Sequence, residues 1–253
     1  MKQKGIIMLA VLGFVALFAN AQQPDKILIA AASDLKFALD SVITVFKKSN
    51  SGTVDVTYGS SGKLFEQISN DAPFDVFFSA DINYPRQLKE RGFTSSDVYP
   101  YGVGRIVLWS KKIDPKKKEM KSLLSSSIKK IAIANPTHAP YGKRAEEAMV
   151  YYKVWESVKD KLVYGENISQ TAQFVTTGAA DIGIVALSLA LSPNMKKEGG
   201  KYFVIPETSH NPLEQGAVIT RHGKENKLAT SFMEFMKSET ANSILIHFGF
   251  TKP

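Results

Sequence analysis

The apolar positions of the first hundred residues alternate between strand-like and helix-like spacing. A continuous apolar run at 27–32 and a run of alternating polarity at 54–58 are each followed by apolar residues at helical spacing. A third buried run at 74–78 leads into a helical pattern that starts near Tyr84. Strands that alternate with helices in this way predict a largely parallel sheet with right-handed crossover connections.

The same strand–turn–helix unit recurs in a second block that begins near Gly104. Its expected strands cover residues 104–110, 130–134, 162–164 and 180–186. A strand at 215–219 is expected to return to the first block, before C-terminal helices at 226–236 and 239–248.

This pattern predicts an α/β protein with two lobes. Lobe I is expected to comprise residues 22–103 plus 216–253, and lobe II residues 104–215. The chain then crosses between the lobes twice, near 101–104 and 214–217. A cleft between two lobes is a usual place for a ligand, and hinged closure is the usual motion of such lobes.

The N-terminal 21 residues have the three parts of a secretory signal peptide. Lys2 and Lys4 precede a nearly unbroken apolar run at 5–18, and Ala19-Asn20-Ala21 is a small-x-small cleavage site. The apolar run is too short to span a bilayer comfortably, although an uncleaved anchor is the alternative interpretation. Cleavage would give a mature chain from Gln22 with no cysteine to carry a lipid anchor. We therefore expect export to a bacterial periplasm.

Composition and charge narrow the function classes. The chain has 253 residues, of which 44% are apolar and none is cysteine. A sizeable core is therefore possible, while thiolate catalysis, cysteine-bound metals and disulfides are excluded. Removing residues 1–21 takes away two lysines and no acid, which lowers the formal charge of +8 by two. The remaining positive charge favours the approach of small anions. The lysines are scattered and no nucleic-acid-binding motif is present, so nucleic acid is not expected as a partner.

Motifs for nucleotide binding and covalent catalysis are missing from the sequence. There is no P-loop, no dinucleotide fingerprint and no nucleophile elbow. The histidines lack the spacing of metal ligands; they are His138, His210, His222 and His247. The turns that follow the predicted strands instead carry Ser, Gly, Ala, Tyr and Asn.

Hydroxyl-bearing residues occupy the turns at which the first three strands end. Ser60 and Ser61 stand in the turn Gly59-Ser60-Ser61-Gly62, and Ser33 and Ser79 follow the other two strands. The carboxyl ends of parallel strands are where such sheets bind ligands. Free N–H groups at helix starts, with hydroxyls beside them, suit an oxyanion. Any single turn of this kind is explained as well by helix capping, but their repetition after four buried strands favours a site for a small anion.

The motifs, in this order and spacing, resemble the periplasmic molybdate-binding proteins of bacterial molybdate ABC transporters. The matching segments are Ala30–Ser33, Gly59–Gly62, Phe78–Asp81, Asn135–Gly142, Gly165–Asn167, Ala180–Val185 and Phe248–Phe250. The resemblance covers nearly all of the mature chain. It implies a type II periplasmic-binding fold, with two α/β lobes, a hinge and a cleft for one tetrahedral oxyanion. It further implies a monomer without cofactor or catalytic activity, which partners a membrane permease.

The resemblance also implies the contacts to the ligand. The hydroxyls of Ser33 and Ser61 and the backbone N–H groups of Tyr141 and Ile168 are expected to bond the oxygens of the anion. Molybdenum would enter only as the bound oxyanion, with no protein ligand to the metal itself. Part of the family has a further ligand tyrosine where this chain has Ala186, so that bond is expected to be lost.

Two side chains depart from the family pattern. The hydroxyl of Tyr141 either compensates for the bond lost at Ala186 or only covers the cleft. Asp34 stands where some relatives have an uncharged residue, and a carboxylate that faces a dianion would be unfavourable. We therefore expect Asp34 to point away from the anion and to favour the first turn of its helix.

The expected function is the capture of molybdate, and of tungstate, for delivery to the permease. Sulfate has the same charge and shape, so its exclusion would depend mainly on cavity size. The alternatives are a binding protein for sulfate or phosphate, an exported enzyme that uses Asp34, Glu166 or His138, and a sensor domain. A sensor would need a membrane tether, which the expected cleavage removes.

Overall fold

The computed structural model describes residues 26–253, which contain two five-stranded sheets. The strands are β1 (Lys26–Ala32), β2 (Thr53–Gly59), β3 (Val76–Ser79), β4 (Tyr99–Gly104), β5 (Ile106–Ser110), β6 (Ile131–Ala134), β7 (Leu162–Gly165), β8 (Ile182–Ala186), β9 (Lys201–Val204) and β10 (Leu213–Ile219). The predicted signal peptide, residues 1–21, and the predicted mature start at Gln22 lie outside the described part of the chain.

Helices connect most of these strands. The α-helices are α1 (Lys36–Phe46), α2 (Ser61–Ser69), α3 (Asn83–Glu90), α4 (Pro140–Tyr151), α5 (Trp155–Val158), α6 (Ile168–Thr177), α7 (Leu187–Ala190), α8 (Pro193–Lys197), α9 (Lys227–Met236) and α10 (Glu239–His247). Short 3₁₀ turns are η1 (Ser33–Leu35), η2 (Pro115–Lys117), η3 (Glu119–Leu124), η4 (Lys159–Lys161) and η5 (Glu207–Ser209). Over residues 26–253, no helix combines the length and the apolar character needed to cross a bilayer.

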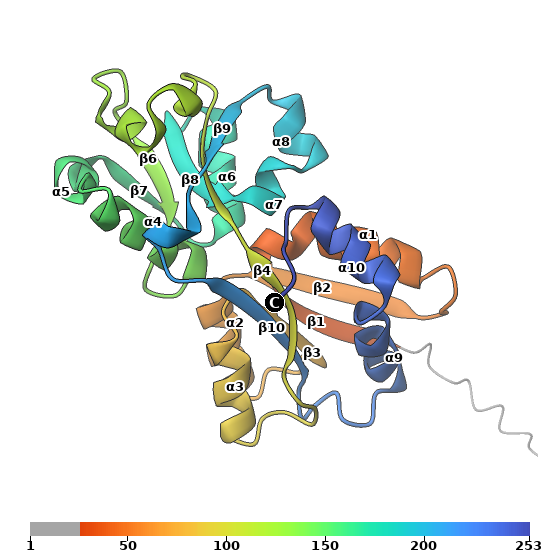
Figure 1. Cartoon of the computed structure of the whole chain (residues 1–253). Coiled ribbons are helices and arrows are strands. Elements are labelled where there is room, and N and C mark those ends of the chain that lie inside the picture. The colour runs from red at the N-terminus through yellow and green to blue at the C-terminus, as the bar shows by residue number, and fades with distance from the viewer. Residues whose placement is uncertain (1–25) are drawn as a thin grey trace, which may run out of the picture.

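The two sheets belong to two separate bodies of the molecule, the lobes. The first sheet has the order β2-β1-β3-β10-β4 and the second the order β7-β6-β8-β5-β9. Strand β1 runs parallel to β2 and β3, whereas β10 runs antiparallel to β3 and β4. In the second sheet β6 is parallel to β7 and β8, and β5 is antiparallel to β8 and β9. Figure 1 shows the chain passing between the lobes along β4 and along β10.

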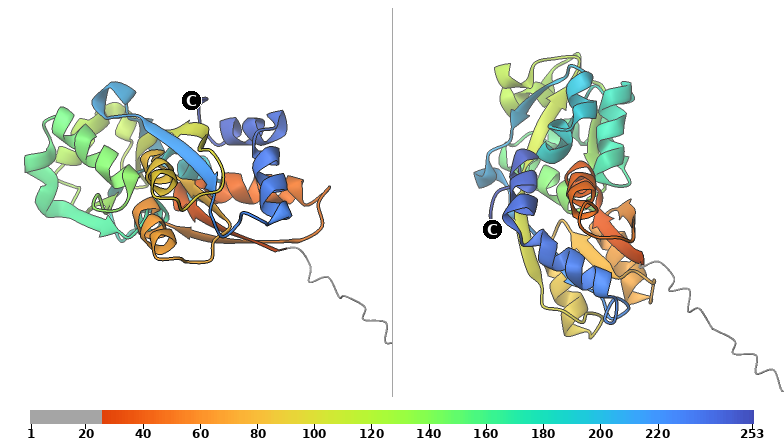
Figure 2. Two further views of the ribbon diagram at one scale, coloured as in Figure 1. Left: turned by 90° about the horizontal axis from the view of Figure 1, so that it is seen from below. Right: turned by 90° about the vertical axis from the view of Figure 1, so that its right-hand side faces the viewer.

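The first sheet is covered by helices on both faces because its strands alternate their side chains. Ile27 and Ile29 of β1 pack in one apolar cluster with α1, α9 and α10, while Ala30 packs in another with α2. This alternation follows from the two-residue period of a strand. Figure 2 shows the C-terminal helices, in dark blue, lying against the red and orange N-terminal elements of the same lobe.

The structure confirms most of the expected strands and corrects one of them. The predicted return of the chain near 215–219 is confirmed, since β10 pairs with β3 and β4. The strand expected at 104–110 is confirmed as β5, but it begins two residues later, at Ile106, because Gly104 ends β4 of the first sheet. Only Arg105 separates the two strands, so the spacing of apolar residues alone does not show where one sheet ends.

Candidate functional site

A small cavity of about 10 Å³ lies where the starts of several helices meet between the lobes. We call it the central cavity; it is lined by Ala32, Ser33, Asp34, Gly59, Ser60, Ser61, Ala80, Ala139, Pro140, Tyr141 and Ile168. All four residues that the sequence singled out as ligand contacts are in this lining: Ser33 and Ser61 from the first lobe, Tyr141 and Ile168 from the second. Ala186 ends β8 and is fully buried, but it is not one of the lining residues.

The hydroxyl of Ser61 has a proton to offer at this cavity. Ser61 is the first residue of α2 and is completely buried. Its Oγ accepts a hydrogen bond from the backbone N–H of Ala80 at 2.9 Å. No acceptor for its hydroxyl proton is found among residues 26–253, so the hydroxyl can donate to a ligand.

Two backbone N–H groups of the second lobe can likewise donate a hydrogen bond to a ligand in this cavity. Tyr141 and Ile168 lie in the first turns of α4 and α6 and are 2% and 4% exposed. Their N–H groups have no hydrogen-bond partner in the described part of the chain. Buried N–H groups are rarely left unpaired in a folded protein. Unpaired N–H groups at helix starts are typical of sites that bind anions.

Helix capping does not explain the hydroxyl residues at this site. Ser60 is the N-cap residue of α2 but makes no capping hydrogen bond. Its Oγ lies 3.0 Å from His138 Nδ1 instead. The turn η1 and helix α4 also lack a side-chain cap, whereas Asn167 caps α6 by accepting from the N–H of Gln170. The capping alternative left open by the sequence therefore fails at Ser60.

Ser33 joins the two lobes directly. Its hydroxyl donates to Asn167 Oδ1 at 3.2 Å and accepts from the N–H of Ser169 at 3.3 Å. Ser169 Oγ in turn donates to the carbonyl oxygen of Ser33 at 2.9 Å. A second lobe-to-lobe bond runs from the N–H of Gly62 to the carbonyl oxygen of His138 at 2.9 Å. The lobes are therefore closed on each other around the central cavity.

Asp34 is one of the residues that line the cavity, and the expectation that its carboxylate points away from the anion stays a prediction. Its side chain is buried, and Oδ2 accepts hydrogen bonds from the hydroxyl of Tyr141 at 3.0 Å and from Gln215 Nε2 at 2.9 Å. Both side-chain donors come from other elements, Tyr141 from α4 and Gln215 from β10. Because Tyr141 gives its proton to Asp34, its hydroxyl has none left for an anion. Gln215 was not predicted as a site residue, although a glutamine within an apolar strand pattern is a signal of a buried polar contact.

Burial raises the pKa values of Asp34, Tyr141 and Tyr101. Loss of solvent raises the pKa of Asp34 to about 6, against the lowering effect of its hydrogen bonds from Gln215 and Tyr141. Burial also raises the pKa of Tyr141 and of Tyr101 well above 10, so both hydroxyls stay neutral. None of the lining residues within 26–253 is a lysine or an arginine.

Charged groups stand at the edge of the cleft. Lys63 of α2 forms an ion pair with Glu166 across the lobes, and both side chains are about half exposed. His138 Nε2 lies 3.8 Å from the same carboxylate. The described residues contain no group of three or more His, Asp or Glu side chains that could hold a metal ion.

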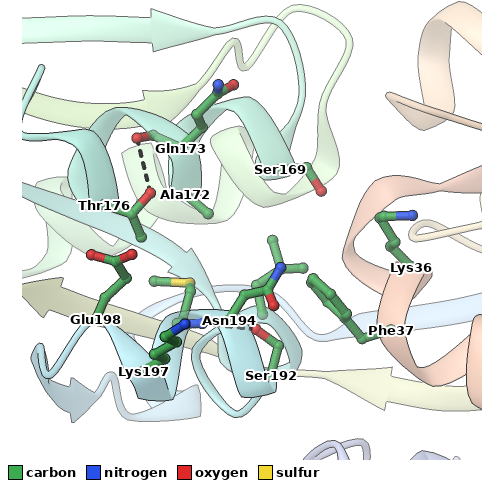
Figure 3. Close-up of a pocket in the computed structure, with 12 residues that line it drawn as sticks. Lys36, Phe37, Ser169, Ala172, Gln173, Thr176, Ser192, Asn194, Lys197 and Glu198 are labelled. Atoms are coloured by element: carbon green, nitrogen blue, oxygen red, sulfur yellow. Dashed lines mark hydrogen bonds between the residues drawn. The ribbon is translucent and has the colours of Figure 1, made fainter.

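A larger groove lies beside the central cavity and has a different character. Figure 3 shows this side groove, of about 370 Å³, with Lys36 and Phe37 of α1 on one side and residues of α6 and α8 on the other. Its polar side chains carry both signs of charge, Lys197 and Glu198 among them. The side groove is lined by residues of α6 from Ser169 to Thr176, and the N–H of Ser169 is already bonded to Ser33 Oγ. It differs from the central cavity in having lysine side chains in its lining.

Comparison with known proteins identifies relatives across nearly the whole chain. A family model described as bacterial extracellular solute-binding protein matches residues 27–251. The molybdate-binding protein ModA of Rhodobacter capsulatus is 35% identical over 228 residues, which cover 89% of this chain and 88% of that protein. ModA of Azotobacter vinelandii is 34% identical over 235 residues, which cover 92% and 93%.

A solved structure agrees with this assignment. The periplasmic molybdate-binding protein of Azotobacter vinelandii has a TM-score of 0.83 at 30% identity and covers 90% of this chain and 99% of that chain. These matches confirm the resemblance and the two-lobed α/β fold that the sequence predicted. The chain belongs to the family of bacterial extracellular solute-binding proteins, and the molybdate-binding proteins are among its relatives within that family.

Proposed function

We propose that this protein captures molybdate, and also tungstate, and delivers it to the membrane permease of an ABC transporter. One observation carries the proposal: the N–H groups of Tyr141 and Ile168 and the hydroxyl proton of Ser61 are unpaired within residues 26–253 and line one buried cavity. Relatives that bear the name molybdate-binding protein support the choice of anion.

Neutral donors suit an anion that must be held and then released unchanged. Hydrogen bonds to a charged acceptor are worth more than those between neutral groups, and the helix starts add partial positive charge without a counter-ion. In the proposed complex the anion replaces Asn167 as the acceptor of the Ser33 hydroxyl. The N–H groups of Tyr141 and Ile168 hold oxygens from the side of the second lobe. Every protein contact is then to an oxygen of the anion and none to molybdenum.

We also propose that the ligand enters by hinged opening of the lobes. The lobe boundaries proposed from the sequence, 22–103 plus 216–253 and 104–215, fall close to the two places where the chain leaves one sheet for the other. The central cavity has room for about one water molecule, which is too little for a tetrahedral oxyanion, so the lobes must move apart to admit one. The bonds from Ser33 to Asn167 and from Gly62 to His138 would break on opening.

The proposal places the mature protein, from Gln22 onward, in the periplasm as a monomeric binding protein. Molybdate would be a ligand, and not a cofactor, of a protein that carries out no catalysis. The closed lobes would present the surface that the permease recognises. Support for these points comes from the signal-peptide pattern at residues 1–21 and from relatives named as molybdate-binding proteins, one of them periplasmic.

Isothermal titration calorimetry of the mature protein tests the proposed ligand. The protein is first unfolded and refolded to remove carried-over anion, and is then titrated with molybdate, tungstate, sulfate and phosphate. The proposal predicts one-to-one binding of molybdate and tungstate and no heat from sulfate. Binding of sulfate or phosphate instead would keep the oxyanion site but refute the ligand. No binding of any of the four would refute the carrier function and favour the enzyme or sensor alternatives.

A further inference from the structure

A buried network of polar side chains adjoins the central cavity and links the two lobes. Gln215 Nε2 donates to Asp34 Oδ2 and to the hydroxyl of Tyr141, which lies 3.1 Å away. Tyr101 donates from its hydroxyl to Gln215 Oε1 at 2.7 Å. Within the described residues, the one polar side-chain atom of this network left without a partner is Asp34 Oδ1. Such a buried orphan atom indicates a missing hydrogen-bond partner.

The network fixes where a proton on Asp34 would sit. Oδ2 already accepts two hydrogen bonds, from Tyr141 and from Gln215. A proton on the carboxyl group therefore belongs on Oδ1, which then becomes a hydroxyl donor in need of an acceptor. Asp34 is one of the lining residues of the central cavity, and the acceptor available there is an oxygen of a bound anion.

The groups that face this carboxyl offer no positive charge to stabilise its ionised form. The titratable ones are the hydroxyls of Tyr141 and Tyr101, and both are neutral because burial raises their pKa. Ser188 of α7 contacts only the backbone, by donating to the carbonyl oxygen of Asp34 at 2.7 Å. Gln215 of β10 is uncharged, and the first turn of α6 holds no acidic or basic residue.

The charged side chains of nearby elements are paired with each other. Lys36 lies next in the chain to the η1 turn and binds Asp40 at 3.2 Å. Lys63 binds Glu166 at the edge of the cleft, and His138 approaches the same carboxylate. A dianion beside an ionised Asp34 would therefore meet a like charge with no cation to offset it, which is unfavourable in a buried site.

We propose that Asp34 binds the anion as a neutral carboxylic acid, donating a hydrogen bond from Oδ1, so that each dianion is captured together with one proton. The proposal rests on the proposed function, because the acceptor is the oxyanion in the central cavity. Asp34 is thus a binding residue in its own right. The proton comes from the solvent on capture and returns to it on release.

Coupling between anion binding and proton uptake by Asp34 makes the affinity depend on pH in a definite direction and over a definite pH range. Burial raises the pKa of Asp34 to about 6 in the closed protein, and a dianion beside it raises the pKa further. The complex is therefore favoured at low pH and weakened as the pH rises. Proton uptake approaches one per anion near pH 8 and falls towards zero below about pH 5, where the free protein already carries the proton. Above about pH 6 the affinity falls by about tenfold for each pH unit, as long as the complex stays protonated.

Calorimetric titration with molybdate between pH 6.5 and pH 8.5, in pairs of buffers with different ionisation enthalpies, measures this proton directly. The matched control is Asp34→Asn, since an amide has the same shape, donates an N–H permanently and still accepts from Tyr141 and Gln215. The wild type should take up about one proton at pH 8 and lose about tenfold in affinity per pH unit. The Asn variant should take up none and should bind with an affinity that does not depend on pH. Protonation of molybdate itself affects both proteins equally and cancels.

A second variant tests the proposal if Asp34→Asn folds poorly, which thermal unfolding without ligand would reveal. Tyr141→Phe removes one of the bonds that lower the pKa of Asp34, while its backbone N–H remains. The onset of proton uptake should then move to higher pH.

The two proposals fail in different ways. Wild-type binding of molybdate without proton uptake at pH 8, with an affinity independent of pH, would overturn the role of Asp34 and leave the carrier function intact. Loss of molybdate binding at every pH in a folded Asp34→Asn protein would also overturn it, since the amide supplies the same donor. Failure of the refolded wild type to bind any oxyanion would overturn both proposals.

Discussion

Replacing Ser61 by alanine removes one donor to the proposed anion and one acceptor within the protein. The lost hydrogen bond to a charged group costs about 1.5–3 kcal/mol of binding free energy, which raises the dissociation constant between about tenfold and about 150-fold. The N–H of Ala80 also loses its acceptor at 2.9 Å. A buried N–H without a partner costs about 1–3 kcal/mol of folding stability. The variant should therefore bind more weakly and unfold at a lower temperature.

Calorimetry with molybdate and thermal unfolding without ligand separate these two effects. The matched control is Ser209→Ala, which deletes a buried hydroxyl that donates to the carbonyl oxygen of Pro206 at 2.7 Å and does not line the central cavity. The control should lose stability and keep the wild-type affinity. If Ser61→Ala loses stability but binds molybdate within twofold of the wild type, the hydroxyl does not contact the anion and the reasoning fails.

Three further substitutions test other parts of the site. Ser33→Ala should weaken molybdate binding by about 1–3 kcal/mol in calorimetry, and wild-type affinity would contradict its assignment as a ligand. Lys63→Ala removes the half-exposed ion pair with Glu166, which is worth about 0–1 kcal/mol. The affinity for molybdate should therefore change less than about fivefold, and less still at high salt. A larger loss would show that direct pairing of Lys63 with the anion matters. Gly62→Ala would place a Cβ 2.8 Å from the carbonyl oxygen of His138 in the other lobe, so it should hinder closure of the lobes and weaken molybdate binding by about tenfold or more. The molybdate-saturated variant should also be more extended than the wild type in small-angle X-ray scattering. Compaction equal to that of the wild type would show that the added methyl group does not hold the lobes apart.

Local sequence patterns predicted which helix starts line the central cavity, while the contacts to a ligand stay a prediction. Ser61 and Ile168 stand at helix starts that follow strands, and the position of a helix start is a property of a short segment. The close approach of α4 to the end of β6 also depends on a short segment of the sequence. A Cβ on Gly142 would lie 2.0 Å from the carbonyl oxygen of Ala134, so a glycine is required there.

The polar network around Asp34 could not be predicted in the same way. Tyr101 and Gln215 lie more than a hundred residues apart, and they meet because β4 pairs with β10. That pairing shifts its register between Gln215 and Gly216, and a bulge of this kind redirects side chains. The sequence gives no local sign of the shift. The hydrogen bonds of Asp34 depend on these distant partners, so the local sequence does not predict them.

The central claim is that one tetrahedral oxyanion binds at the helix starts between the lobes. A crystal structure of the mature protein with molybdate, with anomalous scattering measured at the molybdenum edge, tests this claim most directly. The account predicts a single peak in the central cavity, with oxygens within hydrogen-bond distance of Ser61 Oγ and of the N–H groups of Tyr141 and Ile168. A peak in the side groove of Figure 3 instead, or none between the lobes, would contradict it.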